Sequence, residues 1–246
     1  MRILSKPYEL ATIAGVLSLL LSSCSVKQAS ITPEGLLNVL GPSPSFNPEN
    51  PPKDWIIVKN GKIKKSQLQI AIKNGTRSLK VTNAENSFII ARRINAMMLA
   101  TPFLSWSWLV EQQSTFGYHP LRIVIGFYGG DPKSRAESRQ SLKWLGNTFP
   151  RHDRIINLTW GESALQRGTL MNTLLDNSSM TSSYIVRGGR ENTGSWWLEA
   201  VDVSTLYRQS WPKDNKANAR IVFIGIAAEA QRFSAPTQFS NIKLFR

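Results

Sequence analysis

Acidic side chains occupy four positions that could serve acid–base chemistry: Glu162, Glu199, Asp202 and Glu229. A glycoside hydrolase needs two carboxyl groups several ångströms apart across one cleft, so Glu162 and Glu229 would have to converge. Asp202 has a competing role, because it stands between a predicted strand and a short helix and fits an N-cap. These acids leave a glycan hydrolase as one open hypothesis, and the sequence assigns no residue as catalytic.

Aromatic and basic side chains give a second kind of candidate site. An exposed indole can stack on a sugar ring or a base, and a nearby cation strengthens that contact. Trp196 and Trp197 are neighbours on a predicted strand, so they point to opposite faces and one of them is expected outside the core. Trp106 and Trp108 share one face, which is expected to be core. The predicted ligand-binding set is Trp160, Glu162, Arg187, Trp197 and Glu229.

The sequence gives little evidence for a metal site or for a catalytic nucleophile. The chain has two histidines, His119 and His152, each beside turn residues, and both are expected in surface loops rather than as metal ligands. Ser163 lacks the Gly-x-Ser-x-Gly context of a hydrolase nucleophile. We therefore expect no metal site and no cofactor.

The single cysteine, Cys24, closes an apolar run near the start of the chain. Arg2 and Lys6 precede this run, which is too short to cross a bilayer and is typical of a signal peptide. Leu21-Ser22-Ser23-Cys24 resembles the bacterial lipobox, whose cysteine takes a diacylglycerol before cleavage. Residues 1–23 are therefore predicted to be a lipoprotein signal peptide, and Cys24 the lipidated residue. Ser25 lacks the aspartate that retains lipoproteins at the inner membrane, which favours an outer-membrane anchor facing the periplasm.

The net charge of the chain favours anionic partners. Lys and Arg outnumber Asp and Glu by 30 to 16, which gives a formal charge of +14. Anionic glycans, lipid head groups and other envelope polymers fit this balance. The basic residues are scattered rather than run together, which argues against a dedicated nucleic-acid arm. The expected partners are the membrane, through the lipid, and a glycan, an anionic polymer or an envelope protein.

Beyond residue 55 the chain alternates short apolar runs of period two with turn residues, as in "SQLQIAIK" and "SFIIARRI". About ten such strands with few helices predict an all-β chain, an antiparallel jelly-roll β-sandwich. Helical inserts are expected at Pro132–Leu145 and Val203–Trp211. Residues 24–45, rich in proline toward their end, are predicted to be a tether in which "ITPEGLLNVLG" is a candidate for one short strand or turn. The sandwich domain is placed at residues 46–246.

The order of several stretches resembles a known family. "SWSWLV", "RIVIGFY", "INLTWGE", "YIVRGG…GSWWLEAVDVSTLYRQSW", "IVFIGIAAEA" and "FSNIKLF" follow one another as in the bacterial domain of unknown function 3047. The resemblance implies a jelly roll similar in outline to carbohydrate-binding modules, and no established activity. The chain departs from the family at Gly117–Pro120 and Glu229–Arg232, where the family has acidic residues. Any ligand that those acids hold elsewhere is in doubt here.

Three hypotheses about function follow from the sequence. The leading one is a non-catalytic, lipid-anchored binding protein of the cell envelope whose jelly roll holds a glycan or an anionic polymer. The second is an interaction module that helps to assemble an envelope complex, which predicts a large exposed apolar patch. The third is a hydrolase acting on glycans.

The lipid anchor is directly testable. Replacing Cys24 by alanine removes the only thiol that can be acylated, so Cys24→Ala is expected to move the protein from the membrane fraction to the soluble fraction or to stall its processing. Fractionation of cells followed by immunoblotting measures the change. Unaltered partitioning with membranes would refute lipidation at this residue.

Overall fold

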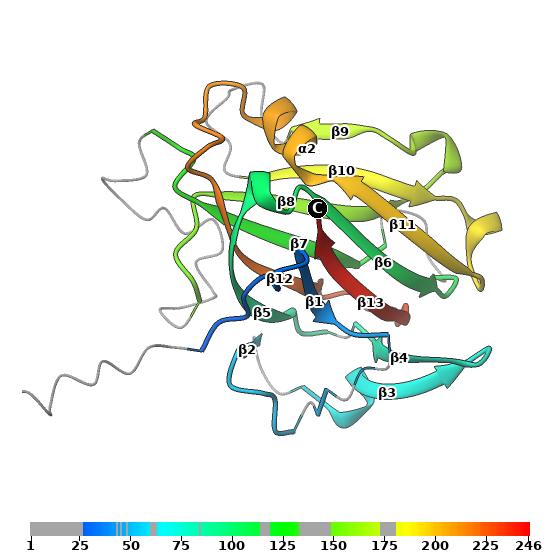
Figure 1. Ribbon diagram of the computed structural model, residues 1–246. Helices are drawn as coiled ribbons and strands as arrows, with labels where there is room; N and C mark the ends of the chain where they lie inside the picture. Colours follow the sequence, from blue (N-terminus) through cyan, green and yellow to red (C-terminus); the bar gives the residue numbers. More distant parts are fainter. Residues whose placement is uncertain are drawn as a thin grey trace, which may run out of the picture.

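The computed structural model describes residues 27–42, 44, 46–47, 49–59, 63–83, 85–113, 119–132, 149–172 and 181–246. Two β-sheets face each other and enclose the core (Figure 1). The predicted signal peptide, Cys24 and, apart from Pro132, the predicted helix at Pro132–Leu145 lie outside the described residues. The antiparallel jelly-roll sandwich predicted from the sequence is confirmed. Every paired strand begins at or after Leu36, so a chain that starts at Ser25 keeps both sheets complete.

The sheet nearer the viewer in Figure 1, called the front sheet, has the strand order β11-β6-β13-β4-β3, with β1 also paired to β13. β13 is shared along its length. Its first residues pair with β4, and Ile242–Phe245 pair with β1. The bounds are β1 Leu36–Leu40, β3 Leu68–Lys73, β4 Thr76–Val81, β6 Phe103–Val110, β11 Trp196–Asp202 and β13 Thr237–Phe245.

The back sheet has the order β2-β5-β12-β7-β8-β10-β9. Its neighbours pair antiparallel except β8 and β10, which run parallel. The bounds are β2 Trp55–Lys59, β5 Phe88–Met97, β7 Leu121–Tyr128, β8 Arg154–Gly161, β9 Leu170–Asn172, β10 Thr181–Gly188 and β12 Arg220–Ala228. Short 3-10 turns lie between the strands: η1 Lys65–Gln67, η2 Met98–Ala100, η4 Ala164–Gln166 and η5 Arg190–Asn192.

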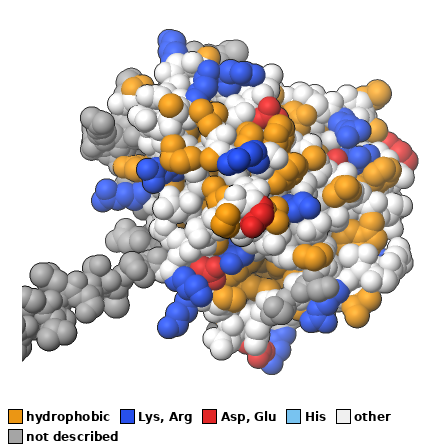
Figure 2. Space-filling view, viewed as in Figure 1, with side chains coloured by type: hydrophobic (Ala, Val, Ile, Leu, Met, Phe, Trp, Pro, Cys, Tyr) orange, Lys and Arg blue, Asp and Glu red, His pale blue; other side chains and the backbone are white. Residues whose placement is uncertain are grey.

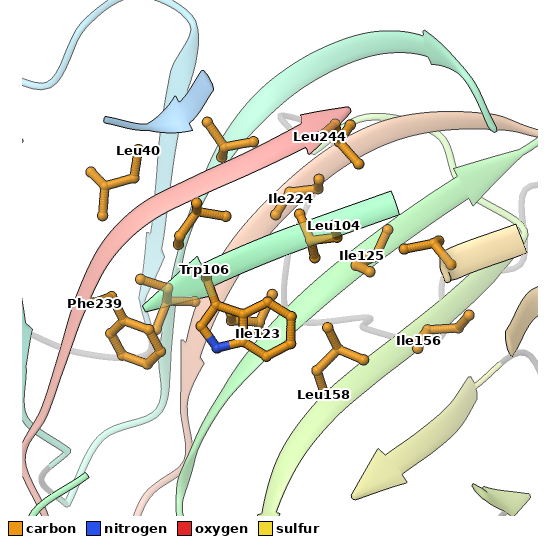
Figure 3. Close-up of a cluster of buried hydrophobic side chains, with 14 of the residues drawn as sticks. Leu40, Leu104, Trp106, Ile123, Ile125, Ile156, Leu158, Ile224, Phe239 and Leu244 are labelled. Carbon is orange, nitrogen blue, oxygen red and sulfur yellow. The ribbon is translucent and has the colours of Figure 1, made fainter. Parts of the chain in front are cut away.

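Alternation along the strands places one set of apolar residues between the sheets, and a second apolar cluster lies on the outer face of the back sheet. On β6, Leu104, Trp106 and Trp108 point inward and are fully buried, as predicted. Trp106 and Trp108 meet edge to face, with ring centroids 5.5 Å apart. Figure 3 shows Trp106 among aliphatic side chains of both sheets, including Ile123 and Ile224. Burying each such side chain stabilises the fold by roughly 1.5–3 kcal/mol, so this inner layer sets which face of each strand is available for function.

The segment expected to be a tether is in part a structural element. Leu36–Leu40 forms β1, with Leu37 and Val39 buried, and Ala29 bridges to Ile94. Beyond β1, the carbonyl of Pro42 accepts a hydrogen bond from the Ser240 hydroxyl. The domain therefore begins before residue 46. The physical reason is that β4 covers only the first part of β13, so β1 supplies the backbone partners that the rest of β13 requires.

The helical insert after β11 is confirmed as α2, Val203–Ser210. Asp202 is its N-cap, because its Oδ1 accepts the Thr205 N–H at 2.9 Å. The residues of α2 that face the core are Val203, Leu206, Tyr207 and Ser210. Along the described part of the chain, no helix has the length and apolar character needed to cross a bilayer.

A buried polar network holds α2 against β8. Arg154 donates two hydrogen bonds to Asp214, at 2.8 and 2.9 Å, and the Tyr207 hydroxyl donates a third at 2.7 Å. Burial, followed by the hydrogen bond to Asp214, raises the pKa of Tyr207 far above its usual range, so the phenol stays protonated and remains a donor. Gly130 is needed beside it, because a Cβ there would lie 2.0 Å from the Tyr207 hydroxyl oxygen.

Candidate functional site

Two of the predicted ligand-binding residues, Arg187 and Trp197, meet between the sheets, where β10, the strand next to the terminal β9, faces β11 at the end of the front sheet. Arg187 on β10 donates from Nε to Glu199 Oε1 on β11 at 2.6 Å. The Arg187 guanidinium carbon also lies 3.8 Å from the ring centroid of Trp197. We call Arg187, Trp197 and Glu199 the inter-sheet clamp, because β10 belongs to the back sheet and β11 to the front sheet.

Glu199 is the anionic centre of this clamp, and its side chain is 3% exposed. Besides Arg187, it accepts a hydrogen bond from the Trp108 indole at 3.4 Å, and Arg167 lies 3.8 Å away at the surface. A buried carboxylate is tolerated only when charges and donors of this kind surround it. Its contacts therefore suit an ionised group that ties the two sheets together.

The tryptophans predicted to bind a ligand serve this inner layer. Trp160 is 4% exposed and packs edge-on against Trp108 at 5.4 Å. Its burial removes Trp160 from the ligand-binding set. Trp197 is half-buried, Arg187 covers its ring, and its indole N–H donates to the Asn192 carbonyl at 2.8 Å. The positions that sequence reasoning favoured for stacking are therefore used in packing.

The two predicted acids are both exposed to solvent and follow strands of the back sheet. Glu229 follows β12 and pairs with Arg122 of β7 at 2.8 Å. Arg122 is the cross-strand partner of Ala227, and Ala227 belongs to the apolar cluster on the outer face of the back sheet. The Arg122–Glu229 ion pair therefore lies on that outer face and not between the sheets. Glu162 is exposed in the turn after β8. Both acids lie at the same end of the back sheet, and Glu229 is held in its ion pair with Arg122.

Both histidines differ from their prediction as surface residues, because they are buried at 6% and 3% exposure. His119 N–H donates to the Trp160 carbonyl, and His119 Nδ1 accepts the Leu121 N–H. His152 packs edge-on against Phe223, with centroids 5.3 Å apart. Both imidazole rings therefore pack inside the protein rather than in solvent. Among the described residues, no three His, Cys, Asp or Glu side chains gather as metal ligands would.

A second surface was not singled out from the sequence. The outward side chains of β11 and β6 form adjoining rows on the front sheet, facing the viewer in Figure 2. Leu198 lies opposite Ser107, and Ala200 lies opposite Ser105, which in turn lies beside Lys243 of β13. We call this surface the β11–β6 face and define it by Trp196, Leu198, Ala200, Phe103, Ser107, Lys243 and Phe245.

The β11–β6 face combines apolar and polar groups. Leu198 is 70% exposed and Phe103 37%, and the Phe103 and Phe245 rings lie 5.5 Å apart. At the far end of β11, the Trp196 indole N–H donates to the Lys73 carbonyl at 3.1 Å, which fixes the ring at the margin of the face. Ser107 and Lys243 are half-buried between these apolar residues. The sequence "SWWLEA" does indicate this face. Side chains alternate along a strand, so if Glu199 points inward, Trp196 and Leu198 must point outward.

The chain matches the model of one protein family over most of its length. The model of the family described as "Protein of unknown function (DUF3047)" matches residues 53–240. The chain belongs to this family. Membership in the DUF3047 family confirms the resemblance noted in the sequence. A search of the curated proteins finds no significant match.

Solved structures similar to this DUF3047 chain include a carbohydrate-binding module and an endoglucanase. The family 11 carbohydrate-binding module of Clostridium thermocellum in complex with a mixed-linked tetrasaccharide is 8% identical, with 87% of this chain and 97% of that chain covered and a TM-score of 0.42. The endoglucanase 3 of Trichoderma harzianum, from family GH12, is 9% identical over 89% and 94%, with a TM-score of 0.39. At this level of similarity neither ligand nor activity transfers to this chain.

Acid is expected to weaken the fold through His119. Burial lowers the pKa of His119 to about 4, against an ordinary 6.5. The unfolded chain therefore takes up the proton first, and the stability present above pH 6.5 is lost as the pH falls toward 4. Between pH 7 and pH 5 the loss amounts to roughly 2 kcal/mol from this residue.

Urea unfolding of the wild type and of His119→Asn at pH 7, 6 and 5 measures this effect. Asparagine keeps an acceptor near the Leu121 N–H and does not titrate in this range, so the variant should have the shallower pH dependence. An equal decline in both proteins would contradict the assignment to His119.

Proposed function

We propose that this protein is a non-catalytic binding module of the bacterial cell envelope, and that its β11–β6 face holds a carbohydrate chain. The resemblance of Leu21-Ser22-Ser23-Cys24 to a lipobox supports a lipid anchor, and Ser25 after the cysteine supports the outer membrane, with the sandwich in the periplasm. The exposed face of β11 and β6 carries the proposal, because it joins apolar and polar groups on the outer side of a hydrogen-bonded sheet.

A pyranose ring presents a face of C–H groups and a rim of hydroxyls. Leu198 and the Phe103–Phe245 pair offer the apolar contact for such a ring. The Ser107 hydroxyl and the Lys243 ammonium stand between them and can bond to ring hydroxyls or to an acidic substituent. Strand pairing fixes the backbone that carries these side chains before any ligand binds, which limits the entropy lost on binding.

Charge favours an acidic glycan or another anionic envelope polymer over a neutral one. The chain carries a formal charge of +14, and Lys243 puts one of its cations on the face itself. Positive potential raises the local concentration of a polyanion and speeds its encounter. This contribution weakens as salt increases.

A protein partner is the second candidate function, and one observation favours it. Leu198 and Ala200 are exposed on β11, the terminal strand of the front sheet. A terminal strand can accept a strand from another chain, and exposed apolar side chains on it can anchor the contact.

Binding to polysaccharides can be tested with the chain from Ser25 onward. Leu198→Asp places a charge in the middle of the face at a position that solvent already reaches, so folding should be retained. Leu165→Asp is the matched control, because Leu165 is 95% exposed and lies on η4, outside the face. Affinity electrophoresis and a glycan array should show at least about tenfold weaker binding for Leu198→Asp only.

Three results would refute the proposal: no binding of the wild type to any acidic or neutral glycan, equal losses in both variants, or full binding by Leu198→Asp. Loss of an envelope protein partner in Leu198→Asp, without any glycan binding by the wild type, would assign the face to protein assembly instead.

A further inference from the structure

The sandwich has a cleft at the edge opposite the inter-sheet clamp. β2 ends the back sheet and β3 ends the front sheet, and the gap between them holds a cavity of about 850 Å³. This size lies within the range of small-molecule sites, roughly 300–1,000 Å³. At the other edge the Arg187–Glu199 pair spans the two sheets, whereas no ion pair among the described residues joins β2 to β3.

The inner wall of this cleft is aliphatic. Ile57 of β2, Leu68 and Ile70 of β3, and Ile63 line it. Leu68 is buried, and the three isoleucines are partly exposed while packing against the main core. These side chains leave apolar surface in contact with solvent. Covering that surface with an apolar ligand lowers the free energy of the system.

The mouth of the cleft is basic. Lys59, Lys64 and Lys65 line it and are exposed to solvent. Glu49 is the one acidic residue among the lining residues, and it already pairs with Lys65 at 2.6 Å. Lys59 and Lys64 therefore leave net positive charge at the entrance. The lower part of Figure 2 shows recessed hydrophobic side chains with Lys and Arg beside them.

We propose that this cleft binds a fatty acid. Its acyl chain would lie along Ile57, Leu68 and Ile70, and its carboxylate would meet Lys59 and Lys64. The aliphatic wall selects a long chain, and the lysines select an anionic head group over a cationic one. The residues that line the cleft are separate from those of the β11–β6 face, so the proposal stands independently of carbohydrate binding there.

Displacement of a fluorescent dansyl-undecanoic acid from the chain that starts at Ser25 tests this site. Hexadecanoate should displace the probe, whereas acetate, which lacks the chain, and hexadecyltrimethylammonium, which has the opposite charge, should displace it at least about tenfold less well. The Lys59→Glu/Lys64→Glu variant should bind the probe at least about tenfold more weakly. Lys213→Glu, which changes an exposed lysine after α2, should bind it as the wild type does.

A floor variant separates binding from folding. Ile70→Trp fills the cleft and should abolish probe binding, while its urea midpoint shows whether the fold is kept. Failure of the wild type to bind the probe would overturn the proposal. So would displacement by acetate or by the cationic amphiphile as effective as that by hexadecanoate, or equal weakening by Lys213→Glu. Glycan binding by the same samples reports on the other face and does not depend on this outcome.

Discussion

The ion pair between Arg187 and Glu199 is the contact on which the arrangement of the proposed binding face depends. Arg187 Nε on β10 lies 2.6 Å from Glu199 Oε1 on β11, so the pair joins the two sheets. The carboxylate is buried, and the guanidinium stacks on the Trp197 ring. Because side chains alternate along a strand, Glu199 pointing inward obliges Leu198 and Ala200 to point outward. A shift of β11 by one residue would exchange the two sets and bury a leucine where the charge now sits.

The two sheets are joined by different contacts at the two sides of the sandwich. At β10 and β11 a salt bridge joins the two sheets, and Leu198 and Ala200 on the outer side of β11 stay exposed. At β2 and β3 the gap remains as a cleft with an aliphatic wall and lysines at its mouth. The same fold therefore offers one surface for a polymer that lies across a sheet and one site for a ligand that enters between sheets. The positive charge of the chain suits an anionic ligand at both.

The sequence predicted the strands well because their alternation reflects burial, and Trp106 and Trp108 point inward as expected. It could not predict which strands become neighbours. Arg187 and Glu199 are close in sequence but belong to different sheets, so their pairing depends on long-range topology. The stretch that contains β1 was only a candidate for a short strand or turn, because its pairing depends on the part of β13 that β4 does not cover. The buried positions of Trp160 and His119 follow from strand ends that pack together only in the folded chain.

A double-mutant cycle on the clamp tests this account most directly. Urea unfolding of the wild type, Arg187→Met, Glu199→Gln and the double variant gives the coupling energy between the two side chains. The structure predicts that the stability losses of the two single variants add up to more than the loss of the double variant. The difference, which is the coupling energy, should be about 2 kcal/mol. Additive losses, with a coupling below about 0.5 kcal/mol, would show that the pair does not tie the sheets together and would contradict the account.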